Sequence, residues 1–136
     1  MAKQSRPTER PPWVRWIDEG DVGQLRRWLG GGGDVEDEDP DTRNTPLTYA
    51  AWHGPIELVH LLLAHGADAG RSGAFLPAVA TNHLDIARLL LPLTDDVDIL
   101  EQAAGDLAEH TDDALLEELV RIKLKRLRAK GGRKRR

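Results

Sequence analysis

At 136 residues, 40% of them hydrophobic and 31% charged, the chain suits one compact soluble domain. It has no cysteine, which excludes disulfides and thiolate metal sites and fits a cytoplasmic protein, and it has no apolar run long enough for a secretion signal or a membrane span. The net charge of -4 is unevenly placed, because residues 34–120 hold nineteen of the 23 acidic side chains and residues 121–136 hold ten of the nineteen basic ones, so the acidic body and the basic end should attract different partners.

The first elements are a charged arm, residues 1–10, which we expect to be flexible, and a pair of helices at residues 11–19 and 20–29. Three tryptophans should face the core of this pair: Trp13, Trp16 and Trp28. The glycine run 30–33 follows. A phosphate-binding loop needs a preceding strand and a following Lys-Ser/Thr, and this run has neither. We therefore interpret it as the end of the second helix.

The acidic run Asp37–Asp41 comes next and has carboxylates at alternate positions, as a calcium-binding loop does. Such a loop also needs a glycine at its sixth position and a glutamate at its twelfth. Those positions hold Thr42 and Thr48. We therefore predict a solvated acidic hairpin tip and no bound calcium.

Residues 45–69, TPLTYAAWHGPIELVHLLLAHGADA, have the clearest helical pattern in the chain. Thr45 is a good N-cap, and Pro46 lies in the first turn, where a helix tolerates proline. Gly54-Pro55 ends this helix and begins the next one, whose apolar residues recur at helical spacing. Gly66 lies where the second helix needs a left-handed residue in order to stop. Two helices this short cannot bury their apolar faces alone, so we expect several copies to stack.

This unit resembles the ankyrin repeat. The matching residues are Thr45-Pro46-Leu47, Ala50-Ala51, Gly54, Glu57, Val59, Leu61-Leu62-Leu63 and Gly66-Ala67-Asp68. Segments 20–29 and 82–91 align with 54–63 at offsets of 34 and 28. The shorter offset removes five residues between Ala69 and Ser72, where the family has its projecting hairpin, so that hairpin should be stunted. Thr48 stands where the family usually has a histidine that ties adjacent repeats together, and it could take only part of that role.

A fourth unit is expected near the end of the chain, with helices at residues 99–109 and 112–127 and with Thr111 as the N-cap of the second. One apolar stripe of that helix is Leu116, Val120, Leu124 and Leu127, with Leu115, Leu119 and Ile122 beside it. The predicted fold is therefore an all-α ankyrin-repeat solenoid of about four stacked helix-turn-helix units over residues 11–127, followed by a disordered basic tail at residues 128–136.

No pattern for catalysis, for a cofactor or for a metal stands out. The five histidines do not pair at ligand spacing, and the two serines, Ser5 and Ser72, have no nucleophile-elbow context. We expect a protein that is not an enzyme and that has no cofactor.

The family resemblance implies protein binding through the inner helices and the hairpin tips. In this sequence the corresponding residues are Arg15, Asp18, Glu19, Asp41, Thr42, Asn44, Tyr49, Trp52 and His53. We expect Trp52 to point outward and to form one aromatic patch with Tyr49, although packing of Trp52 against a neighbouring inner helix is a competing interpretation. The acidic residues in this set favour a basic protein partner, as an inhibitor or immunity-type protein would have. We expect the chain to be a monomer on its own and to have no membrane contact.

The basic end has three competing interpretations: a solvated helix end, a contact with nucleic acid or another polyanion, and a segment that folds back onto the acidic body or serves as an import signal. The candidate polyanion-binding residues are Lys130, Arg133, Lys134, Arg135 and Arg136. Because the tail has no aromatic residue, any contact with nucleic acid should be to phosphates. An adaptor associated with nucleic acid is therefore the alternative function, and a scaffold that bridges two proteins is a third.

Overall fold

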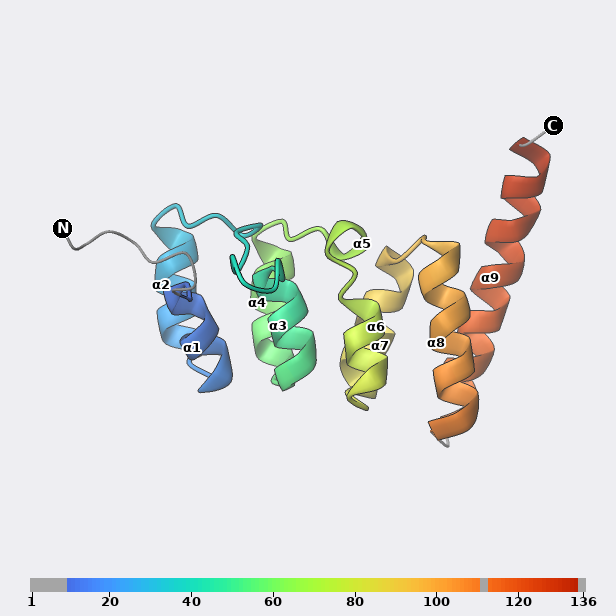
Figure 1. The fold of residues 1–136 in the computed structure, drawn as a ribbon, viewed down its shortest axis with the longest axis horizontal. Helices are drawn as coiled ribbons and strands as arrows, with labels where there is room; N and C mark the ends of the chain where they lie inside the picture. The colour runs from blue at the N-terminus through green and yellow to red at the C-terminus, as the bar shows by residue number, and fades with distance from the viewer. Residues whose placement is uncertain (1–9, 111–112, 135–136) are drawn as a thin grey trace. The chain divides into compact units, whose positions relative to one another are not determined.

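A computed structural model describes residues 10–110 and 113–134, and in this part of the chain every regular element is a helix. The helices are α1 (Pro12–Asp18), α2 (Val22–Gly30), α3 (Pro46–His53), α4 (Ile56–Ala64), α5 (Ala69–Ser72), α6 (Phe75–Ala80), α7 (Leu84–Leu90), the 3-10 turn η1 (Leu91–Leu93), α8 (Val97–His110) and α9 (Ala114–Lys134). The chain divides into two compact units, residues 1–68 and 69–136 (Figure 1).

The first unit contains two helix pairs, α1–α2 and α3–α4, as the sequence predicted. The inner helices α1 and α3 contact each other, and so do the outer helices α2 and α4. Its core consists of fully or almost fully buried side chains: Trp13, Val14, Ile17, Leu25, Leu29, Leu47, Leu58, Val59 and Leu62. Trp16 and Trp28 are only partly buried, with ring centroids 6.3 Å apart. The prediction that all three of these tryptophans face the core is therefore right for Trp13 alone.

The repeat register predicted from the sequence is visible in the backbone. Gly20, Gly54 and Asn82, which the alignment makes equivalent, have φ of 69°, 105° and 63°. Gly32 and Gly66, which are also equivalent, have φ of 100° and 90°. A left-handed conformation at matching positions shows that the same helix-turn-helix geometry recurs. The glycine run 30–33 is the end of α2, as predicted.

The connections differ between the two places where the family has a hairpin. Residues 31–45 form a long acidic loop that precedes α3 in the first unit. Ahead of α6, in the second unit, the connection includes the single helical turn α5, which agrees with the stunted hairpin that the five-residue deletion predicted. The acidic loop is therefore the longer of these two connections (Figure 1).

The second unit contains the helix pairs α6–α7 and α8–α9, with α6 against α8. Its core consists of buried side chains from all four helices: Phe75, Ala78, Ile86, Ala87, Leu90, Leu100, Ala103, Leu107, Leu116, Val120 and Leu124. The side chain of Asp113 accepts a hydrogen bond from the backbone N–H of Leu116 at 3.0 Å and so caps the start of α9. The predicted cap, Thr111, lies outside the described residues.

The helix end predicted at residue 127 is too early, since α9 continues to Lys134. Arginine, lysine, leucine and alanine follow one another at residues 126–130, and all four favour helix, while basic charge suits a helix C-terminus. The basic segment 128–134 is therefore helical where disorder was expected. Most of the predicted N-terminal arm, and the last two residues, lie outside the described residues.

Candidate protein-binding site

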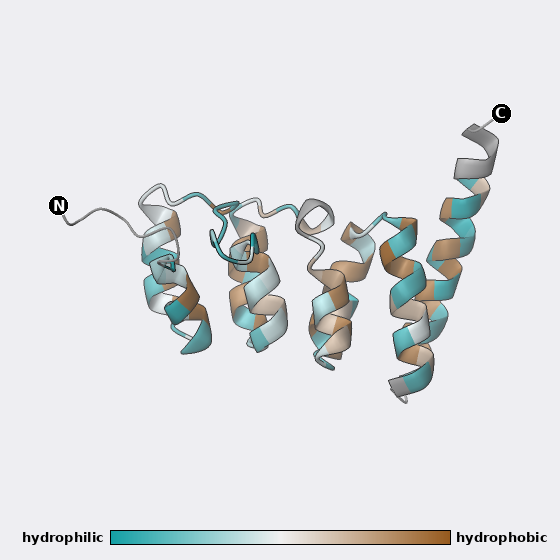
Figure 2. Cartoon of the chain, viewed as in Figure 1, coloured by the Kyte–Doolittle hydropathy of each residue, from teal (hydrophilic) through white to brown (hydrophobic). Residues whose placement is uncertain are grey.

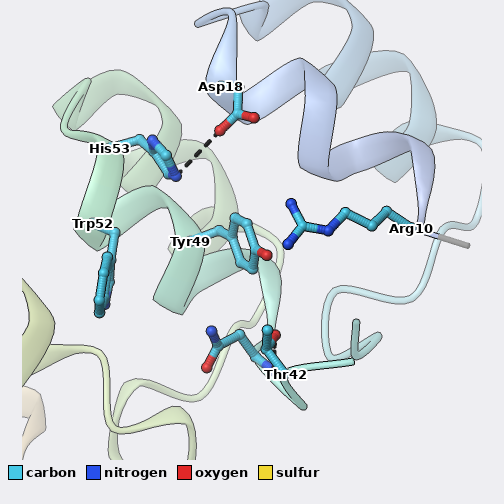
Figure 3. A pocket seen from close by; sticks show the side chains of 7 residues that line it. Arg10, Asp18, Thr42, Tyr49, Trp52 and His53 are labelled. Carbon is cyan, nitrogen blue, oxygen red and sulfur yellow. Dashed lines mark hydrogen bonds and ion pairs between the residues drawn. The ribbon is translucent and has the colours of Figure 1, made fainter. Parts of the chain in front are cut away.

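A pocket of about 320 Å³ opens on the inner face of the first unit, beside α3 (Figure 3). Its lining residues are Arg10, Asp18, Thr42, Asn44, Tyr49, Trp52 and His53. They come from the segment before α1, from the end of α1, from the acidic loop and from α3. A helix pair and a loop that are distant in sequence therefore converge on one hollow.

The acidic loop is held in place by a buried carboxylate, that of Asp39. Its side chain is 0% exposed, and it accepts hydrogen bonds from the Tyr49 hydroxyl and from the backbone N–H of Asp41, both at 2.9 Å. The Nε of Arg10 lies 3.6 Å from the same carboxylate. A buried charge is tolerated only when it is paired and hydrogen-bonded. Asp39 meets this condition with partners on three segments, so it fastens the loop to α3.

A second carboxylate of the loop, that of Asp37, accepts a hydrogen bond from the indole N–H of Trp13 at 2.8 Å. The Trp13 ring meets Tyr49 edge-on, with centroids 5.5 Å apart. The backbone closes the loop as well, because the N–H of Asp39 donates to the carbonyl of Asn44 at 2.9 Å. The prediction of a solvated acidic hairpin tip is therefore wrong for Asp37 and Asp39. Both carboxylates face inward, where they accept hydrogen bonds from the Trp13 indole and the Tyr49 hydroxyl, polar groups that need partners when buried.

The Tyr49 hydroxyl is held in its neutral form. Burial raises the pKa of Tyr49 above its usual value of about 10, and the hydrogen bond to Asp39 raises it further. The hydroxyl can therefore act as a hydrogen-bond donor to Asp39 well into alkaline solution.

His53 links the two inner helices at the other side of the pocket. Its ring stacks on Tyr49, with centroids 5.8 Å apart and 20° between the planes. Its Nε2 lies 3.1 Å from the carboxylate of Asp18 on α1, and both side chains are about half exposed (Figure 3). The Asp18 carboxylate is thus oriented by His53 and still open to solvent.

Trp52 and Tyr49 do not form the single exposed patch that the sequence predicted. Trp52 is 52% exposed, as expected, but Tyr49 is 8% exposed. Tyr49 turns toward Trp13, Asp39 and His53 because those residues complete its packing and its hydrogen bond. Trp52 is therefore the exposed aromatic side chain of this pocket, and Tyr49 forms part of its wall.

Six of the nine residues predicted to bind a partner line the pocket: Asp18, Thr42, Asn44, Tyr49, Trp52 and His53. The other three are outside it. Arg15 and Glu19 lie on the exposed side of α1, 3.9 Å from each other, and Asp41 is exposed on the loop. Arg10 was missed, because the sequence placed it in a flexible arm. Only its contact with Asp39, 29 residues later, identifies it.

The basic residues of α9 are spread around the helix and partly engaged within their own unit. Arg121 lies 2.7 Å from Glu117, Lys123 lies 3.0 Å from Asp95, and Arg128 contacts Glu101. Lys125, Arg126 and Lys130 are exposed. Of the other candidate polyanion-binding residues, Arg133 and Lys134 belong to the last turn of α9, while Arg135 and Arg136 lie outside the described residues.

Two further observations concern metals and membranes. Within residues 10–110 and 113–134, no three histidine or acidic side chains gather closely enough to hold a metal ion. In the same part of the chain, each helix is too short or too polar to cross a membrane.

Comparison with known proteins agrees with the repeat pattern. A family model described as ankyrin repeats, in three copies, matches residues 17–103. The chain is 29% identical over 109 residues to the Caenorhabditis elegans protein "Ankyrin repeat and KH domain-containing protein mask-1", covering 76% of this chain and 4% of that protein. It is 38% identical over 77 residues to "Ankyrin repeat domain-containing protein 13B" of mouse and of human, covering 53% of this chain and 12% of each relative. The chain thus spans a small part of each of these relatives.

Proposed function

Because the chain belongs to the ankyrin-repeat family, whose repeats generally mediate protein–protein interaction and are typically not enzymes, we propose that its first unit binds a basic protein partner at the pocket beside α3. The observation that carries this proposal is the position of Trp52. It is a large aromatic side chain, half exposed, at the edge of a pocket with a charged rim. Binding sites on proteins commonly have this arrangement of an aromatic anchor and polar surroundings.

The chemistry of the pocket favours a cationic side chain. The Trp52 ring offers a π face to a guanidinium or an ammonium group. The Asp18 carboxylate, held by His53 at 3.1 Å, offers an anionic acceptor on the same pocket. An arginine of the partner could use both groups at once, because its planar fork stacks on aromatic rings and also pairs with carboxylates.

The charge of the first unit points in the same direction. Between residues 10 and 68 the chain has eleven acidic and five basic side chains. Several of the carboxylates have partners within the unit, among them Asp37, Asp39 and Glu38, but their field still extends into solvent over about one Debye length. This field should speed the approach of a basic protein more than it strengthens the final complex.

One specific form of this function is inhibition. A basic effector that acts on nucleic acid has its own cationic surface, and an acidic protein seated on that surface would block it. This form predicts that the captured partner loses its activity when the complex forms, and it needs no further chemistry from the chain.

Replacing Trp52 by alanine tests the proposal. The intact protein and the Trp52→Ala variant are used as bait, bound proteins are quantified, and the affinity of any protein lost with the variant is measured by calorimetry. The substitution should weaken binding by about 2 kcal/mol or more, the usual scale of an interface hot spot. It should lower the free energy of unfolding by much less, because a half-exposed side chain leaves no closed cavity.

Leu93→Ala is the matched control, since Leu93 is 48% exposed and lies in the second unit. This variant should bind the partner as the unchanged protein does. The proposal fails if both variants bind equally well, or if the bound partner is acidic. A loss of about 3 kcal/mol or more in unfolding free energy for Trp52→Ala would make Trp52 a core residue instead.

Contact with a polyanion through α9 remains the second candidate function. The observation that favours it is the exposure of Lys125, Arg126 and Lys130 on α9. They belong to a stretch of the sequence, residues 121–136, that holds ten basic residues. Against it, Arg121, Lys123 and Arg128 contact acidic residues of their own unit.

A further inference from the structure

Helix α9 has two apolar faces. One face, with Leu116, Val120 and Leu124, is buried in the second unit. The other consists of Leu115, Leu119 and Ile122, which are 62%, 38% and 43% exposed. We call these three residues the outer stripe. Their spacing of four and three residues places them on one side of the helix, more than a quarter turn away from the buried face.

The outer stripe is unusual because the exposed helices of a repeat stack normally present polar residues to water. Apolar (brown) and polar (teal) residues recur together along α9 in Figure 2. The next position on the same side, one turn after Ile122, is Arg126, whose aliphatic stem extends the apolar surface. Contiguous exposed apolar surface of this kind commonly marks an interaction site.

The charges on α9 are graded along the helix axis. Glu117 and Glu118 lie in its first half, whereas Lys125, Arg126 and Lys130 lie in its second half. Two copies of α9 aligned in parallel would bring like charges together. Two antiparallel copies would bring the acidic half of each against the basic half of the other and would also align the helix dipoles favourably.

We propose that the outer stripe of α9 binds a second copy of this chain, with the two α9 helices antiparallel. Leu119 of each copy then packs on Ile122 of the other, and Leu115 packs on the stem of Arg126 of the other. Glu118 and Lys125, seven residues apart, lie on the same edge of the stripe. In the antiparallel pair they form two symmetric ion pairs between the copies, as charged residues flanking a helix seam do.

The opposite edge of the stripe does not oppose this pairing. Lys123 lies there, and its ammonium group is held within its own unit, where it donates to the carbonyl of Leu91 at 2.7 Å and lies 3.0 Å from Asp95. Its charge is therefore partly neutralised before the copies meet. Three apolar side chains per copy form a small interface, so the association should be weak and dependent on concentration.

Self-association by α9 extends the function proposed above without depending on it. A pair of copies would present two pockets beside α3 in one particle, and a partner with two basic sites would then bind more tightly than one copy alone allows. The monomer expected from the sequence would be the species at low concentration.

Sedimentation equilibrium of the full chain tests the pairing. After nuclease treatment, the apparent mass should rise from 15.1 kDa toward twice that value between about 10 μM and about 1 mM. Leu119→Glu should hold the mass at that of a monomer over the same range. Leu93→Glu, which changes a leucine that is 48% exposed and lies outside the stripe, should leave the association unchanged. Circular dichroism of both variants checks that they fold.

Charge reversal tests the antiparallel orientation. Glu118→Lys and Lys125→Glu should each weaken self-association by about fivefold or more, because each turns two attractions into two repulsions. Mixing the two single variants should restore association, since a mixed pair has opposite charges at both contacts. A parallel pair would already bring like charges together at both positions, so neither single variant would weaken it.

Three results would overturn the proposal. They are a mass that stays at one copy up to about 1 mM, the upper end of that range, association that Leu119→Glu does not weaken, and charge-reversed variants that do not recover when mixed. The first result would leave the outer stripe to a different protein, and the second would place the contact between copies on another surface.

Discussion

Asp39 has a role that its position in an acidic run conceals. Among the carboxylates between residues 34 and 41, that of Asp39 is the fully buried one. It contacts Tyr49, Arg10 and the backbone of its own loop. Its neighbours Glu38 and Asp41 are exposed. A single run of acidic residues therefore divides into two that fix the loop, Asp39 and the Trp13-bonded Asp37, and others that contribute charge to the surface.

The pKa of Tyr49 gives a direct test of this arrangement, because Tyr49 is the one tyrosine in the sequence. The ultraviolet absorbance of its phenolate, followed against pH, should show a midpoint above the usual value of about 10 in the native protein and close to it in urea. The native pKa is the higher one, so this group stabilises the fold below pH of about 10, and that contribution is lost as the pH rises through the native pKa.

Asp39→Asn is the control for this titration. It removes the negative charge and keeps an acceptor near the hydroxyl, so the pKa of Tyr49 should fall toward its usual value while burial keeps it somewhat raised. A native midpoint equal to that in urea would mean that Tyr49 is exposed and that the loop is not fastened to α3.

At the scale of elements, the glycines at the end of α2 and just after it have different structural requirements. A side chain at Gly33 would lie 2.3 Å from the ring of Trp28, whereas one at Gly30 would meet nothing within 4 Å. Gly30 also lies inside α2, where alanine is the better residue by up to about 1 kcal/mol. The structure therefore needs a glycine at position 33 and does not need one at position 30.

These two positions form a matched pair of variants. Gly33→Ala should lower the free energy of unfolding by about 1–3 kcal/mol, because the partly buried Trp28 ring must shift. Gly30→Ala should leave it unchanged or raise it. Urea unfolding of the two variants measures the difference. Equal stability of both would show that Trp28 moves aside freely.

At the scale of the whole chain, the salt dependence of binding distinguishes a contact made by the basic end from one made by the acidic body. If residues 129–136 contact phosphates, the logarithm of the affinity for a DNA or RNA oligonucleotide should fall steeply with the logarithm of the salt concentration. Deleting those residues should flatten this slope. Gel shifts or fluorescence anisotropy at several salt concentrations give both slopes, and identical slopes would remove the basic end from consideration.

The similarity to known proteins also concerns the chain as a whole. The matched region covers residues 17–103 and identifies the repeats, yet the chain spans 4% and 12% of the length of the relatives described above. The repeats alone therefore establish the family, and the residues of the pocket and of α9 carry the functional proposals.

The sequence by itself determined the features that depend on local pattern. Apolar spacing and capping residues located the helix pairs within one or two residues for α1–α4, and the left-handed positions Gly54 and Gly66 followed from the repeat. The exposure of Trp52 was also predictable, because its position on α3 follows from the helical repeat. Six pocket residues could be named for the same reason.

Only the tertiary structure decided the contacts between distant segments. Trp13 and Asp37 are 24 residues apart, Asp68 and Glu36 are 32 apart, and Arg10 reaches Asp39 from a segment that looked flexible. No local pattern distinguishes a buried carboxylate from its exposed neighbours, since burial depends on which polar group of the core needs a partner. Tyr49 and Asp39, which the sequence placed at the surface, are therefore buried in the structure. The outer stripe of α9 is exposed. Both outcomes depend on tertiary packing, which the periodicity of the sequence does not reveal.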